Sequence, residues 1–266
     1  MKHKALSAVI LAFGLASAGS ASAIVVGGVD FGTLGQTSHL ETTTLAETFI
    51  TGNNQTLQGY GVVNTVNGLA SYAGTNQLYY TFSYTSHNYT GTSVSFDNGV
   101  VDLYLGPTFN LLNQSSASNL GIIQGYSEWV QALGHADASG YELNSTGTFT
   151  GPTINFFGGG LLDSDTSGSF GLMSVANYLN GNSQPDGLGG FADMLLSSSG
   201  NNTPSRLNPF DNVTGCDTGT APAGTWCIAG SADISGATTV PEPGTLALLG
   251  LGLLGVGFAR RRKISS

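Results

Sequence analysis

The chain has 266 residues and is acidic, with 16 Asp and Glu residues against 7 Lys and Arg residues. All basic residues except Arg206 lie near the two ends, so residues 24–239 hold one basic and 15 acidic residues, a net charge of −14. A region of this charge repels phosphate backbones, which excludes nucleic acid as a partner. Apolar residues make up 40% of the chain, too many for a disordered protein, and together with the abundant glycine they indicate an extracellular β-protein.

The N-terminus has the three parts of a secretory signal peptide. Lys2, His3 and Lys4 supply positive charge, residues 5–18 are mostly apolar, and Ala21-Ser22-Ala23 is a small-residue cleavage site. We therefore expect residues 1–23 to be removed on export. The folded domain is expected at residues 24–239, a length that suits one sizeable secreted β-domain.

Short apolar or alternating segments, separated by Gly, Asn and Ser, predict a series of β-strands. The clearest spans residues 77–84, in which every second residue from Leu78 to Tyr84 is bulky. Asp97-Asn98-Gly99 lies between two such segments and predicts a hairpin turn, because Asn-Gly tolerates positive φ. The predicted strands are residues 25–31, 46–51, 58–65, 77–84, 93–96, 100–105, 146–150, 153–157, 168–176, 189–196 and 228–234.

Residues 118–134 form the exception, because their apolar residues recur at helical spacing and Ser118 is a candidate N-cap. Gly121 and Gly125 each cost about 1 kcal/mol in a helix interior, so a pair of strands is the alternative. The remaining pattern predicts an all-β domain. We expect an antiparallel two-sheet sandwich that resembles a jelly roll.

Cys216 and Cys227 are the only two cysteines. In an exported chain this pair predicts a structural disulfide. Zinc binding is disfavoured because a zinc site needs about four ligands and no histidine lies near either cysteine.

One acidic segment is a candidate cation site. Asp163, Asp165 and Ser167, followed by Gly168, match the opening half of a calcium-binding loop, in which alternating oxygens surround the ion. Ser174 occupies the position where an EF-hand has a bidentate glutamate. A solvated acidic turn without calcium is therefore the alternative, and no other cofactor is expected.

Two further motifs resemble parts of hydrolase sites. Asp217-Thr218-Gly219 contains the triplet of acid proteases, but it follows a cysteine of the predicted disulfide and has no second copy. Ser127 lies in a near match to G-x-S-x-G, with Trp129 in place of the last glycine. His39, His87 and His135 are isolated in the sequence. We therefore predict no catalytic residue.

The last 27 residues, 240–266, have the composition of a membrane-sorting tail. Pro241-Glu242-Pro243 precedes an uncharged run at residues 245–259, which is followed by Arg260, Arg261, Arg262 and Lys263. A helix of that length at about 1.5 Å per residue spans roughly 22 Å, less than the roughly 30 Å hydrocarbon core of a bilayer. The basic cluster favours a cytoplasmic end and acts as a stop-transfer signal. We expect one short transmembrane helix.

These residues resemble the PEP-CTERM sorting signal of Gram-negative bacteria, in which an exosortase recognises Pro-Glu-Pro and removes the tail. A plain membrane anchor is the alternative. The resemblance implies a transient stay in the inner membrane, exosortase as a partner, and delivery to the cell surface or extracellular matrix. Residues 58–105 also loosely resemble the flocculation-associated members of this group.

The resemblance implies a role with exopolysaccharide in biofilm or floc formation. We therefore expect a non-enzymatic surface or matrix protein whose partners are exopolysaccharide or other matrix components. A carbohydrate-binding module and an exported hydrolase are the two alternatives.

Overall fold

A computed structural model describes residues 23–33, 37–203, 207–211 and 214–239. The predicted signal peptide, the Pro-Glu-Pro motif, the transmembrane helix and the basic cluster at residues 260–263 lie outside the described residues, except for Ala23. Residues 23–239 form one compact unit. No helix within the described residues has both the length and the apolar character needed to cross a membrane.

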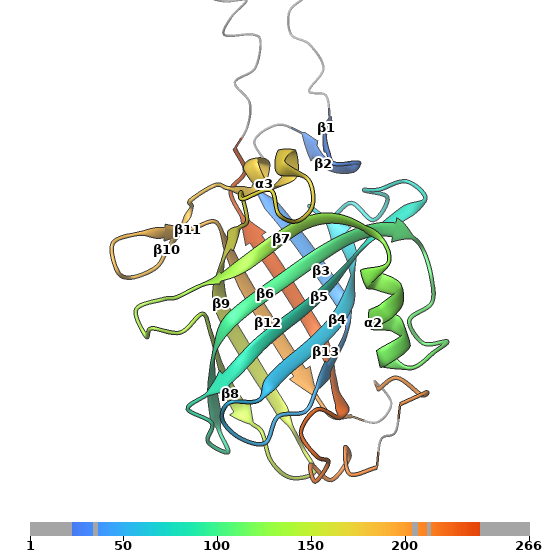
Figure 1. Ribbon diagram of the computed structural model, residues 1–266, viewed down its shortest axis with the longest axis vertical. Coiled ribbons are helices and arrows are strands. Elements are labelled where there is room, and N and C mark those ends of the chain that lie inside the picture. Colours follow the sequence, from blue (N-terminus) through green and yellow to red (C-terminus); the bar gives the residue numbers. More distant parts are fainter. Residues whose placement is uncertain (1–22, 34–36, 204–206, 212–213, 240–266) are drawn as a thin grey trace, which may run out of the picture. The chain divides into compact units, whose positions relative to one another are not determined.

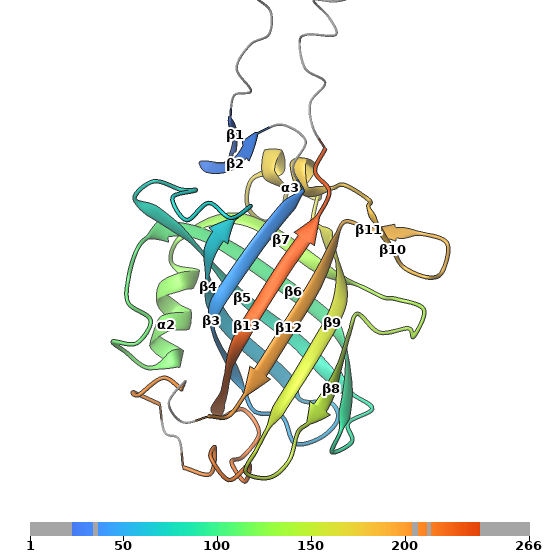
Figure 2. The same cartoon turned by 180° about the vertical axis from the view of Figure 1, so that it is seen from behind.

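The strands of this unit close into a barrel (Figures 1 and 2). Each strand pairs with the next around the ring in the order β12-β13-β3-β4-β5-β6-β7-β9, and a β9–β12 ladder closes it. The short strand β8 shares the place of β7, because both pair with β6 and β9. All pairings are antiparallel. The barrel strands are β3 (Ser38–Thr48), β4 (Thr56–Val66), β5 (Asn76–His87), β6 (Ser93–Pro107), β7 (Ser127–His135), β8 (Leu143–Thr148), β9 (Asn155–Ser164), β12 (Met194–Asn201) and β13 (Trp226–Gly236).

The all-β prediction is confirmed, whereas the two-sheet sandwich is not: the strands form a closed barrel. The strands follow one another up and down the ring, and the last strand, β13, pairs with β3. Closure removes the unpaired edges that a sandwich leaves at the ends of its sheets. Alternation within a strand is the same in both architectures, which is why the sequence pattern did not distinguish them.

The predicted hairpin at Asp97-Asn98-Gly99 is wrong, because these residues lie inside the continuous strand β6. The register of β5 against β6 shifts between Ser83 and Thr85, and Asn98 has φ of 51°. A Cβ atom at Gly99 would lie 2.2 Å from a ring carbon of Tyr84. The Asn-Gly pair therefore makes a β-bulge that accommodates the Tyr84 ring, and the strand continues past it.

Several segments differ from their predicted secondary structure. Residues 25–31, predicted as one strand, form the hairpin of β1 (Ala23–Val26) and β2 (Val29–Thr33), with a turn at Gly27 and Gly28. The helical pattern at 118–134 divides into α2 (Ser116–Gln124), capped at Gly125, and the strand β7. The predicted strand at 168–176 is largely replaced by loop and by the start of α3 (Met173–Leu179). In residues 118–134 and 168–176 the apolar residues are only partly buried: Ile123, Trp129, Val130 and Val175 are buried, whereas Ile122, Leu133, Leu172 and Met173 are exposed. Short apolar runs do not distinguish helix from strand.

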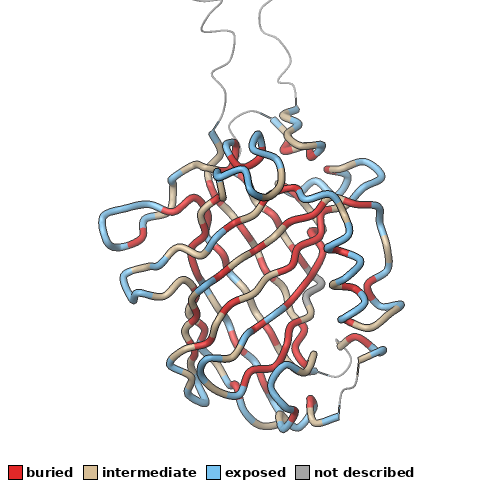
Figure 3. Tube along the Cα trace, in the orientation of Figure 1, coloured by how far each residue is buried: buried red, intermediate tan, exposed pale blue. Residues whose placement is uncertain are grey.

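Smaller elements cover the barrel from outside. The hairpin of β1 (Ala23–Val26) and β2 (Val29–Thr33) lies with α3 at one end of the barrel, and α2 lies on its outer face beside β5 (Figure 1). The hairpin of β10 (Gln184–Pro185) and β11 (Phe191–Ala192) projects from the side. Buried residues are concentrated along the barrel strands (Figure 3). They include a second apolar cluster between α2 and the outer face of the barrel.

Cys216 and Cys227 form a disulfide, as predicted. The loop between the two cysteines is hydrogen-bonded to Phe49, the first residue after β3. The Phe49 N–H donates to the Thr225 carbonyl (2.7 Å), and the Gly224 N–H donates to the Phe49 carbonyl (2.8 Å). Asn202 adds a bond from its side-chain amide to the Cys216 carbonyl (2.6 Å). Hydrogen bonds therefore hold the disulfide-closed loop against Phe49, a residue that lines a cavity inside the barrel.

Candidate functional site

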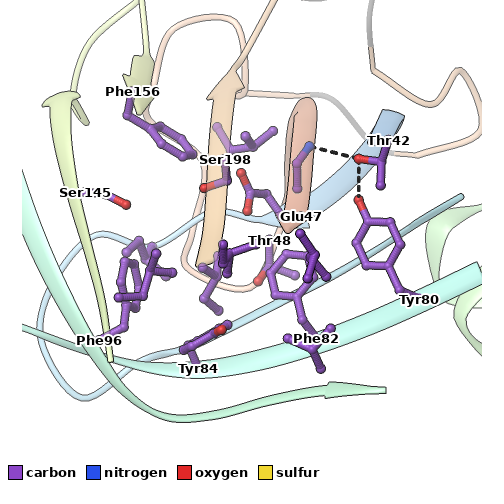
Figure 4. Close-up of a pocket in the computed structure, with 18 of the residues that line it drawn as sticks. Thr42, Glu47, Thr48, Tyr80, Phe82, Tyr84, Phe96, Ser145, Phe156 and Ser198 are labelled. Carbon is purple, nitrogen blue, oxygen red and sulfur yellow. Dashed lines mark hydrogen bonds between the residues drawn. The ribbon is translucent and has the colours of Figure 1, made fainter. Parts of the chain in front are cut away.

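The barrel encloses an apolar cavity (Figure 4). The cavity volume is about 60 Å³. Because one water needs roughly 10–15 Å³, the cavity has room for several waters or a small organic group. Its walls come from strands all around the barrel. The lining residues are Leu40, Thr42, Glu47, Thr48, Phe49, Ile50, Leu57, Val63, Tyr80, Phe82, Tyr84, Phe96, Val101, Leu103, Leu143, Ser145, Phe149, Ile154, Phe156, Leu196, Ser198, Ile228, Ala232 and Ile234.

Glycines on three strands make room for side chains of neighbouring strands inside the barrel. A Cβ atom at Gly59 would lie 2.0 Å from the Phe82 ring, and one at Gly158 would lie 2.4 Å from the Ser145 hydroxyl. A Cβ at Gly200 would lie 2.7 Å from Oε1 of Glu47. Glycine at these places therefore leaves room for the Phe82 ring, the Ser145 hydroxyl and the Glu47 carboxyl group. An eight-stranded barrel is wide enough either to be filled by its side chains or to hold one small ligand.

A β-bulge in β3 turns Glu47 into the barrel. Thr42 pairs with Val63 and Glu47 pairs with Gly59, with register shifts on both sides of Thr42. Both Thr42 and Glu47 line the cavity although they are five positions apart, a spacing that puts side chains on opposite faces of a regular strand. Between them, the inserted residue of the bulge reverses the alternation.

The Glu47 carboxyl group is buried without a hydrogen-bond partner for its Oε1 atom among the described residues. The residue is 4% exposed, and burial raises its pKa from the ordinary 4.5 to about 8. Figure 4 shows the carboxyl group pointing toward the side of the cavity that carries Ser198. Glu47 therefore presents a neutral carboxylic acid to the cavity at neutral pH.

Other polar groups of the lining differ in whether they have a hydrogen-bond partner. Thr42 Oγ1 contacts the Tyr80 hydroxyl (3.2 Å) and accepts a bond from the Ala232 N–H (2.8 Å). The Tyr84 hydroxyl, by contrast, is buried with no hydrogen-bond partner among the described residues. Burial raises the pKa of both tyrosines, so both remain protonated at neutral pH. The residues that line the cavity thus include two, Glu47 and Tyr84, with a buried side-chain oxygen that has no hydrogen-bond partner among the described residues.

The residues of the predicted calcium loop do not converge. The Asp163 carboxylate contacts His135, whereas Asp165 accepts bonds from the backbone and hydroxyl of Ser167 (2.8 and 2.9 Å). Within the described residues, no group of three or more His, Cys, Asp and Glu side chains could hold a metal ion. The structure therefore brings Asp165 and Ser167 together as a turn and places Asp163 with a different partner.

His135 bridges two acidic residues on separate segments. Its Nδ1 lies 2.7 Å from Asp163 on β9, and its Nε2 lies 3.4 Å from Asp186 beside the β10–β11 hairpin. The hydrogen bond to Asp163 raises the pKa of His135, with a smaller contribution from Asp186. This cluster ties the projecting hairpin to the barrel wall.

We expect His135 to stabilise the fold more at acidic pH than at alkaline pH. Because its folded-state pKa is raised, its contribution is fully present below about pH 6.5 and is lost as pH rises through the folded pKa. A His135→Gln variant should lose up to about 1 kcal/mol at pH 6 and less at pH 9. Urea unfolding at the two pH values measures this, with His39→Gln as the control. An equal loss at both pH values would contradict the ion-pair role.

The hydrolase-like motifs are separated from the cavity. Ser127 is exposed at the start of β7, and Asp217 is exposed within the disulfide loop. Glu47 is the one carboxyl group among the described cavity-lining residues. The paired carboxylates of a hydrolase are therefore not found in the described lining.

The two tryptophans do not form an exposed stacking surface. Trp129 is 1% exposed, and its indole N–H donates to the Gly27 carbonyl (3.0 Å). Trp226 is half-buried, with its ring centroid 5.5 Å from that of Tyr60. A carbohydrate platform built on these rings would require the two side chains to leave the apolar clusters in which they pack.

Sequence reasoning assigned no role to Glu47 or Tyr84. The one available signal is a single acidic residue within the apolar run Leu45-Ala46-Glu47-Thr48-Phe49-Ile50. Regular alternation from Leu40 and Thr42 would place Glu47 on the outside, and the bulge that reverses it has no sequence signature in this run. Tyr84 was predicted on the buried face of its strand, and the structure confirms that.

Comparison with known proteins identifies the tail and leaves the barrel without a match. Residues 239–263 match the family model of the PEP-CTERM protein-sorting motif. This confirms the resemblance of Pro241-Glu242-Pro243 and the basic cluster at 260–263 to that signal. No curated protein and no solved structure matches the chain significantly.

Proposed function

We propose that this exported exosortase substrate is a non-enzymatic protein of the cell surface or extracellular matrix, and that its barrel binds a small, largely apolar molecule there. The sorting motif indicates export and processing by exosortase. The observation that supports binding is the apolar cavity, which retains a buried carboxyl group without a partner for one of its oxygens. An unsatisfied buried polar group costs about 1–3 kcal/mol, a cost that a ligand would offset.

Because its tail resembles the PEP-CTERM signal, we propose that this binding protein acts in an exopolysaccharide-containing matrix, in biofilm or floc formation. The mature region has a net charge of −14, so association with neutral sugars rather than anionic polymers suits it. A carbohydrate-binding module is less well supported, because Trp129 is buried. An exported hydrolase is less well supported because the described cavity lining offers one carboxyl group.

Sorting is tested in a host that carries the protein, with and without its exosortase. We expect the wild-type strain to yield a protein that lacks the basic cluster at residues 260–263 and is found at the surface or in the matrix. The strain without exosortase should retain the full tail in its inner membrane. Intact mass and fractionation measure both results, and a retained tail in both strains would contradict the sorting role.

Ligand binding is tested with isopropylbenzene and a matched pair of variants. Ser198 lines the cavity, whereas Ser197 is exposed on the same strand. We expect isopropylbenzene to raise the melting temperature of the exported wild-type protein and of Ser197→Leu, because a ligand that binds only the folded state stabilises it. The increase should disappear in Ser198→Leu, where the side chain occupies the cavity. An equal increase in both variants would show that the probe binds elsewhere.

A further inference from the structure

Glu47 gives the cavity a chemical preference as well as a shape. Its carboxyl group is held among apolar walls, beside Gly200, and Oε1 has no partner among the described residues. We propose that Glu47, as a neutral carboxylic acid, donates a hydrogen bond to a carbonyl or hydroxyl oxygen of an otherwise apolar ligand. This inference rests on the proposed function, because it assigns the ligand class for the same cavity.

The buried side chains of Glu47 and Tyr84, which have no hydrogen-bond partner for Oε1 and the hydroxyl among the described residues, favour an acceptor on the ligand. A carboxylic acid and a phenol each carry one O–H donor. The hydroxyl of Thr42 is already engaged by Tyr80 and by the Ala232 N–H. Glu47 and Tyr84 therefore both have a donor to offer inside the same cavity, and a carbonyl oxygen, which has two lone pairs, can accept from such donors.

The charges around the cavity favour a neutral ligand. Besides Glu47, the titratable groups of the described lining are Tyr80 and Tyr84, both from β5; β4, β6, β8, β9, β12 and β13 contribute none. From outside the lining, Asp233 of β13 acts on Tyr80 and Glu142 acts on Tyr84. No Lys, Arg or His lies among the described lining residues, so a ligand carboxylate would be buried there without a counter-charge, which is strongly unfavourable.

The side chains that line the cavity indicate what the apolar part of the ligand is. Aromatic rings from five segments surround the space, including Phe82, Phe96 and Phe156, and Phe149 and Phe156 stack with centroids 5.2 Å apart. Such walls suit a compact aromatic or branched aliphatic body. A phenyl ring with one short oxygen-bearing substituent therefore represents the expected ligand class.

The test compares three phenyl compounds with the same number of non-hydrogen atoms that differ in one substituent group: isopropylbenzene, acetophenone and 1-phenylethylamine. Dissociation constants are measured on the exported protein by calorimetry. We expect Glu47→Leu to reduce the preference for acetophenone over isopropylbenzene by about fivefold to tenfold, the equivalent of one hydrogen bond. Glu47→Gln, which keeps an N–H donor, should largely retain that preference. An unchanged preference in Glu47→Leu would overturn the inference.

The pH dependence supplies a second readout that structural damage would not imitate. If ligand binding needs the acid form, acetophenone should bind the wild-type protein about tenfold more weakly at pH 9 than at pH 6, because burial holds the Glu47 pKa at about 8. Glu47→Gln should show no such change. Glu128→Gln, which alters an exposed carboxylate on β7, should behave as wild type.

Two further outcomes separate this inference from the proposed function. Binding of 1-phenylethylamine that exceeds acetophenone binding and strengthens from pH 6 to pH 9 would overturn the acceptor class and make Glu47 a counter-ion. Failure of all three probes to bind the wild-type protein would overturn the proposed function itself.

Discussion

A Glu47→Gln variant is expected to be more stable than the wild-type protein at pH 8 and above, by on the order of 4 kcal/mol. The reason is the cost of ionising a carboxyl group inside an apolar barrel. Burial raises the pKa of Glu47 from 4.5 to about 8, so between these values the folded state holds a proton that the unfolded state has lost. Stability must therefore fall as pH rises across this window, by about 1.4 kcal/mol per unit, and level off above it.

Urea unfolding at pH 4.5, 6, 7, 8 and 9 measures this effect. The free energy of unfolding of Glu47→Gln minus that of wild type should grow from pH 4.5 to pH 8 and then stay constant. Glu128→Gln is the control, because Glu128 is exposed, and its difference from wild type should stay near zero. Parallel curves for wild type and Glu47→Gln would show that Glu47 is ionised in the folded barrel. The binding inference would then lose its donor.

Replacing Trp129 with alanine is expected to destabilise the protein by about 3–5 kcal/mol, the usual cost of removing a fully buried large aromatic side chain. Trp129 is 1% exposed and stacks on Phe31 of β2, with ring centroids 6.2 Å apart. Its indole N–H bonds the Gly27 carbonyl in the β1–β2 turn, where a Cβ atom would lie 2.5 Å from Val175 of α3. Trp129 thus joins β7 to the two elements at this end of the barrel.

Chemical unfolding of Trp129→Ala and Trp129→Phe separates packing from hydrogen bonding. The phenylalanine variant keeps much of the ring contact but loses the N–H donor, so it should lose less stability than the alanine variant. A loss below about 1 kcal/mol in Trp129→Ala would mean that the β1–β2 hairpin and α3 contribute little to the stability of the barrel.

The tail and the local strand pattern were readable from the sequence for a physical reason. Pro241-Glu242-Pro243, the uncharged run and the basic cluster are contiguous, and a sorting signal works through this local order. Strand β5 was predictable because its bulky residues alternate along one chain segment. The disulfide was predictable because the chain has two cysteines. None of these features requires knowledge of which segments meet in space.

The barrel and its cavity depend on contacts between distant segments, and the tertiary structure decided them. Closure depends on β13 meeting β3 and β12 meeting β9, pairings for which the alternating pattern carries no signal. The inward position of Glu47 depends on a bulge near Thr42 that reverses the alternation of β3. The sequence by itself determined the sorting motif at residues 239–263 and the β-rich character of the domain. Which carboxyl group faces the interior was decided by register, because a shift of one residue moves a side chain from one face of a strand to the other.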